Sequence, residues 1–73
     1  MPECEEVIYD ALEALRKYVV DRITAAIFQH ECEKHGVNCD RYERWDRIAS
    51  YSLDILNAKM KNVRIFCKVS EVG

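Results

Sequence analysis

The chain has 73 residues, 49% of them hydrophobic and 33% charged, and its net charge is −2. A chain this short is expected to form one domain, and this composition excludes a disordered polymer. It has no apolar run approaching the ~20 residues that a membrane span needs. Because the first residues are acidic and lack a secretory pattern, we expect a cytoplasmic protein whose cysteines are thiols rather than disulfides.

Residues from about 3 to 35 are predicted to form the first helix. Apolar side chains recur there at steps of three and four residues, which is helical period, at Ile8, Leu12, Leu15, Val19, Ile23 and Ala26. Three further apolar residues lie off this stripe, namely Tyr9, Val20 and Phe28. The helix therefore has a second apolar side that one neighbouring helix cannot cover.

A short connection is predicted at residues 36–40. Gly36 suits the left-handed position just past a helix end, because it has no Cβ. Asp40 suits the N-cap of the next helix, and Glu43 can complete a capping box with it. A connection of this length places the two helices side by side and antiparallel.

The second helix is predicted over residues from about 41 to 61, followed by a tail at 62–73. In the tail, Val63, Ile65 and Cys67 alternate with polar residues, which is typical of a strand. A lone strand needs a neighbour, so we expect it to pair with another copy or with a target. The alternative is that the second helix simply continues through the tail.

The fold class predicted is mainly α: a long antiparallel helical hairpin with a short strand-like tail, dimerising into a four-helix bundle. A hairpin alone has no interior, so a second copy is expected to cover it. Residues 1–35 are mainly acidic and residues 56–73 mainly basic, which favours antiparallel pairing of two chains. The predicted core consists of Leu12, Leu15, Val19, Ile23, Trp45, Ala49, Leu56 and Met60.

One cluster could bind zinc, which takes cysteine and histidine ligands in a tetrahedron. Cys32 and His35 share a helix face, and Cys39 on the connection could fold back to them. No paired Cys-x-x-Cys motif accompanies them. The preferred interpretation is structural, with packed thiols and no metal or other cofactor, and a Cys32–Cys39 disulfide is a further alternative.

The function expected from the sequence is binding rather than catalysis. We expect a small cytoplasmic adaptor, inhibitor or regulator that forms a homodimer and occupies an unidentified protein partner. Aromatic and large apolar residues anchor interfaces, which makes the candidate contacts Tyr9, Val20, Phe28, Tyr42 and Phe66.

Two alternative functions remain. The first is a DNA-binding regulator whose basic tail contacts phosphate through Lys59, Lys61, Arg64 and Lys68. A net acidic chain makes nucleic acid the less favoured partner. The second is a zinc-stabilised interaction protein built on the cysteine and histidine cluster.

Overall fold

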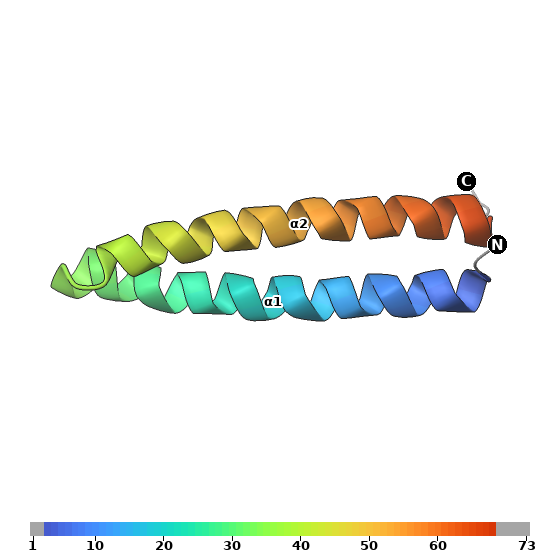
Figure 1. Ribbon diagram of the computed structural model, residues 1–73. Coiled ribbons are helices and arrows are strands. Elements are labelled where there is room, and N and C mark those ends of the chain that lie inside the picture. The colour runs from blue at the N-terminus through green and yellow to red at the C-terminus, as the bar shows by residue number, and fades with distance from the viewer. Residues whose placement is uncertain (1–2, 69–73) are drawn as a thin grey trace, which may run out of the picture.

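The computed structural model describes residues 3–68 and contains two helices, α1 (Cys4–His35) and α2 (Cys39–Cys67). They lie side by side and antiparallel, with the start of α1 and the end of α2 at the same end of the hairpin (Figure 1). The molecule is long and thin, with extents of 48 × 28 × 13 Å. The predicted antiparallel hairpin is confirmed. Neither helix is long and apolar enough to cross a bilayer.

The turn between the helices is shorter than the sequence suggested. Gly36 adopts the expected left-handed conformation, with φ 67°, and its N–H donates to the Cys32 carbonyl at 3.0 Å. The prediction of an Asp40 cap is wrong, because Asn38 precedes α2 at φ 59° and the helix has already begun at Cys39. The Asn38 side chain instead donates to the Glu31 carboxylate, at 2.5 Å, and ties the turn back to α1.

The tail is helical as far as Cys67, so the strand prediction is wrong for the part of the tail that the structure describes. A strand at Val63–Cys67 would leave its backbone groups without partners, whereas a helix satisfies them internally. The remaining tail residues of that prediction, including Val69, lie outside the described residues, as do Met1 and Pro2.

Two disulfides close the hairpin, one at each end. Cys4–Cys67 joins the start of α1 to the end of α2, and Cys32–Cys39 brackets the turn; the Cα atoms are 4.8 Å apart in both. The expectation of thiols is therefore wrong. Because disulfides persist where conditions are oxidising, the pairing indicates such a compartment rather than the cytoplasm.

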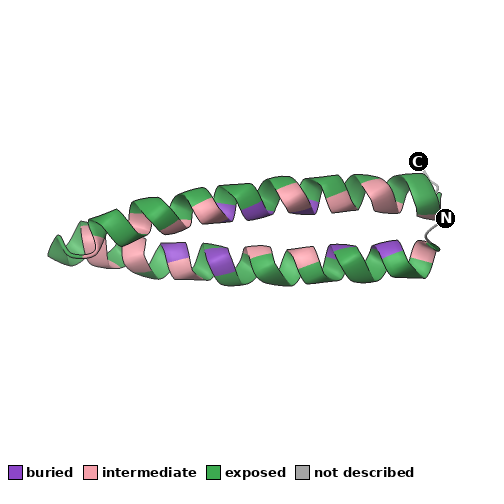
Figure 2. Cartoon of the chain, viewed as in Figure 1, coloured by how far each residue is buried: buried purple, intermediate pink, exposed green. Residues whose placement is uncertain are grey.

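The helices meet along a line of small side chains. In Figure 2 the buried positions face one another across the two helices. The most buried residues of this line are Ala25, which is 0% exposed, Ser52, at 2%, and Ala49, at 3%. On α1 the contact residues alternate in steps of three and four, as in a coiled coil: Val7, Ala11, Ala14, Tyr18, Asp21, Ala25, Phe28 and Cys32.

The predicted core is correct on α2 except at Met60, and it is wrong on α1. Ala49 and Leu56 are buried and Trp45 is half-buried. Met60 and all four α1 residues of the predicted core are exposed: Leu12, Leu15, Val19 and Ile23. The contact line of α1 runs one position earlier, through smaller side chains. Small residues allow the helix axes to approach closely, as the end disulfides require.

Candidate protein-binding face

Several of the larger apolar side chains that α1 does not use against α2 gather on one side of the hairpin, called here the apolar face. Leu12 is 53% exposed, Leu15 43% and Met60 43%. Positions four and seven residues apart share a helix side, so Val19 extends the line of Leu12 and Leu15, and Leu53 that of Met60. The apolar face is defined by Ile8, Leu12, Leu15, Val19, Leu53 and Met60.

A groove of about 430 Å³ runs between the helices within this face. Its walls are entirely apolar side chains, contributed by Ile8, Ala11, Leu12, Leu15, Leu56, Met60 and Val63. The groove exists because Ala11, on the contact line, is too small to fill the space between the bulkier flanking residues. It offers hydrophobic contact and no hydrogen-bonding side chain.

The apolar face ends in charged residues in the direction of the turn. Arg22 and Asp46 approach to 3.9 Å across the two helices, and the side chains of both are about half exposed. Another groove lies between Tyr18, Leu53 and this pair. An exposed pair of this kind stabilises the hairpin by at most ~1 kcal/mol, so it marks a polar boundary rather than a structural anchor.

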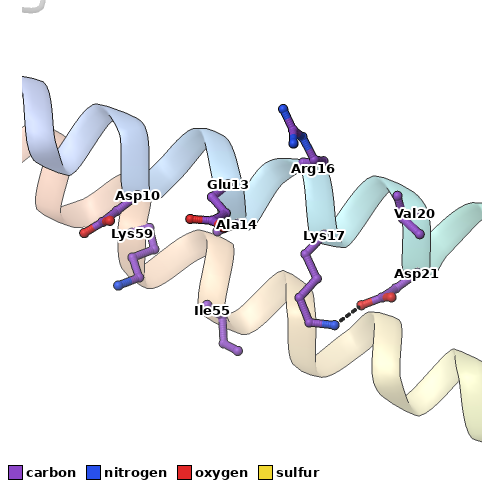
Figure 3. Close-up of a pocket in the computed structure, with 9 residues that line it drawn as sticks. All are labelled: Asp10, Glu13, Ala14, Arg16, Lys17, Val20, Asp21, Ile55 and Lys59. Atoms are coloured by element: carbon purple, nitrogen blue, oxygen red, sulfur yellow. Dashed lines mark hydrogen bonds and ion pairs between the residues drawn. The ribbon is translucent and has the colours of Figure 1, made fainter.

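The groove along Asp10, Lys17 and Lys59 has a different chemistry (Figure 3). There Asp10 and Glu13 accompany basic side chains, while Arg16 points away from the facing helix. The Lys17 ammonium lies 2.9 Å from the Asp21 carboxylate. This mixed charge favours ion pairing within the groove over the concentration of carboxylates that a divalent cation needs.

Asp21 is the buried charge of the hairpin, with 4% of its surface exposed. The Ser52 hydroxyl donates to its carboxylate from α2, at 2.5 Å. Burial acts to raise the pKa of Asp21, but the hydrogen bonds from Ser52 and Lys17 and the Lys17 charge outweigh it, so the pKa is lowered. The carboxylate is thereby held ionised between the helices, where only one register of α2 brings Ser52 to it.

The residues predicted to bind a partner do not form one surface. Tyr9 and Val20 are 63% and 55% exposed, and Phe66 is also exposed. Phe28 and Tyr42 are half-buried instead. Phe28 lies on the contact line near the turn, and the Arg41 guanidinium sits 5.9 Å from the centre of its ring. Phe28 therefore packs within the hairpin and Tyr42 is partly covered, while the other three are open to solvent.

The residues predicted to contact nucleic acid lie in the last part of α2 and just after it, towards the end of the hairpin away from the turn. Lys61, Arg64 and Lys68 are exposed, whereas Lys59 lines the mixed-charge groove. Figure 1 places the end of α2 beside the start of α1, which carries Glu5 and Glu6. These acidic and basic segments were expected to attract each other between two chains. In the structure the acidic start of α1 and the basic end of α2 already lie together within one chain.

The zinc candidates do not assemble in this structure. Cys32 and Cys39 bond to each other, so neither sulfur is a thiolate. The His35 ring lies 6.5 Å from the ring of His30. Among residues 3–68 no group of three or more histidine, cysteine, aspartate or glutamate side chains is arranged to hold a metal ion.

Sequence reasoning gave the Cys32–Cys39 disulfide as an alternative, which the structure confirms, but it missed the Cys4–Cys67 disulfide and the role of Asp21. The cysteine signal was present: the spacing from Cys4 to Cys32 equals that from Cys39 to Cys67, four heptads in each helix, so the pairs coincide at both ends of an antiparallel hairpin. No pattern pointed to Asp21, which resembles a solvated helix residue. No family model matches the chain, and neither a curated protein nor a solved structure is similar enough to match.

Proposed function

We propose that this chain is a small protein-binding module, an adaptor, inhibitor or regulator, that acts through helix surfaces as a homodimer of disulfide-closed hairpins. The observation that carries the proposal is that the most buried contacts between the helices are made by small residues, Ala25, Ser52 and Ala49, while most of the large apolar side chains of α1 face outward. Exposing such residues costs solubility without contributing to the hairpin, which favours a role in association.

In the proposed dimer two hairpins stack as a four-helix bundle. Stacking gives the molecule the interior that a single layer of two helices lacks. Two exposed α1 residues outside the apolar face, Tyr9 and Val20, and the exposed Phe66 on α2 are then the proposed contacts for a different protein. Such side chains supply large contact area at small entropic cost and often anchor interfaces.

The disulfides fit this role. A binding surface on two thin helices is useful only when the helices keep one geometry, because ordering them on contact would cost affinity. The disulfides at both ends fix the spacing of α1 and α2 before any partner arrives. The protein would therefore present a preformed surface.

A capture experiment with matched variants tests the proposal. Tagged wild type, Tyr9→Ala and Tyr51→Ala would be incubated with native extract from the source cells, and retained proteins quantified by mass spectrometry. Tyr51 is the control because it is 67% exposed, close to the 63% of Tyr9. We expect specific proteins to be retained by wild type and Tyr51→Ala and lost with Tyr9→Ala. Equal retention by all three baits would contradict the proposed contact site.

A further inference from the structure

We infer that the apolar face is covered by the same face of a second copy, with α1 of one hairpin lying antiparallel on α1 of the other. The inference rests on the proposed function, since it names which surface forms the dimer and in which orientation. Three features of the hairpin support it: the exposed area, the position of the apolar face along the hairpin, and the charges at the ends of that face.

The surface area calls for a partner of the size of the hairpin itself. The chain exposes 5863 Å². A compact monomer of 8.6 kDa would expose about 4,700 Å², so the hairpin exposes roughly 1,200 Å² more than its mass requires. A standard interface removes about 800 Å² from each partner. One second copy stacked on the flat hairpin therefore matches the excess.

The position of the apolar face selects the antiparallel stack. The face occupies the part of α1 from Ile8 to Val19, nearer the termini than the turn. Towards the turn the line of Val19 continues through Ile23 and Ala26, which are apolar, but the line of Leu15 continues through Arg22 to Gln29 and Glu33, which are polar. A stack with both turns at the same end would press these polar segments together. A stack with the turns at opposite ends joins apolar to apolar and leaves the polar segments in water.

The charges at the ends of the face are self-complementary in that orientation. When Leu12 of one copy lies opposite Leu15 of the other, antiparallel geometry also brings Ile8 opposite Val19. The same register brings Glu5 opposite Arg22, and two-fold symmetry repeats each pair. Both residues are exposed and lie on the lines that carry the apolar face. The register that pairs the apolar residues thus also pairs opposite charges at both ends.

Sedimentation equilibrium across a dilution series tests the covered face. We expect the wild type to be a dimer and Leu12→Glu to weaken dimerisation by more than about 30-fold, as for an interface hot spot. Tyr51→Glu is the matched control, because Tyr51 is 67% exposed but lies two positions from Leu53, on the side of α2 away from the apolar face. It should dimerise like the wild type. Circular dichroism and intact mass would show that each variant keeps its helices and both disulfides.

Charge reversal tests the orientation. We expect Glu5→Lys to weaken dimerisation by up to about fivefold for each of the two Glu5–Arg22 pairs in the dimer. The double variant Glu5→Lys with Arg22→Glu should regain the affinity of the wild type, because it restores opposite charges. A monomeric wild type, a dimeric Leu12→Glu or a monomeric Tyr51→Glu would overturn the inference, and the absence of rescue would overturn the antiparallel register. Protein capture that depends on Tyr9 could persist in each of these cases, so the proposed function fails or survives separately.

Discussion

The disulfide between Cys4 and Cys67 should contribute more to stability than the one between Cys32 and Cys39. Cross-linking restricts the unfolded chain, and the effect grows with the length of the loop that is closed. The first disulfide spans 63 residues and the second 7. Loop-closure entropy then gives about 4 kcal/mol for the long loop and about 2.5 kcal/mol for the short one.

These values are large beside the stability available to so short a chain. At typical values per residue, 73 residues correspond to a free energy of unfolding of about 4–11 kcal/mol. The buried core is small, with Ala25 and Ala49 at its centre, and adds little hydrophobic free energy. We therefore expect a chain without the Cys4–Cys67 disulfide to be marginally folded at 25 °C.

Urea unfolding followed by circular dichroism measures the difference. The comparison is between the wild type, Cys4→Ser with Cys67→Ser, and Cys32→Ser with Cys39→Ser. All three must be at one protein concentration, because association adds to apparent stability. The free energy of unfolding should fall by ~1–2 kcal/mol more in the first double variant than in the second. An equal or larger loss from removing the short-loop disulfide would refute the loop-closure reasoning.

Three further predictions concern single positions. The pKa of Asp21 in the folded state lies below the ordinary value of 3.8, so its stabilising contribution is full above pH 3.8 and is lost as the pH falls through the folded-state pKa. In urea unfolding at several pH values, Asp21→Asn should remove part of this loss of stability in acid. An unchanged pH profile in the variant would contradict this prediction. Ala25→Leu should lower the free energy of unfolding by about 1–3 kcal/mol because it forces the helices apart, whereas Ala26→Leu on the exposed side should lower it by under about 0.5 kcal/mol. Equal losses in the two variants would contradict the position of the contact line on α1. Gly36→Ala should lower the melting temperature through a backbone cost of roughly 1–2 kcal/mol, since no atom lies within 4 Å of the added Cβ, and Gly36→Asn should cost less.

The helices and the turn could be predicted from the types of residue at nearby positions in the sequence. Apolar residues at helical spacing predicted α1, and Gly36 predicted the left-handed turn that ends it. The end of α2 was ambiguous because Val63, Ile65 and Cys67 satisfy a strand period while the same segment also fits a helix. Local pattern could not decide between them, since the deciding constraint is the bond from Cys67 to Cys4 at the other end of the chain.

The side of α1 that packs on α2 could not be predicted from the hydrophobicity of the sequence. The stripe through Leu12 and Leu15 is the more hydrophobic one, and a rule that buries the largest apolar residues chooses it. The structure buries the neighbouring line through Ala11 and Ala25. Cys4 and Cys32 lie on that line, and their bonds to α2 hold it against the second helix. Pairing of cysteines therefore overrides the size of the apolar side chains.

The sequence by itself determined that the chain forms two helices, because helical period and the turn glycine act over a few positions. Tertiary structure alone decided how far α2 extends, which line of α1 is buried and where Asp21 finds its partners. Each of these depends on contacts between residues far apart in the chain, from Cys4–Cys67 to Asp21–Ser52. The same long-range contacts turn the large apolar residues outward and so create the apolar face.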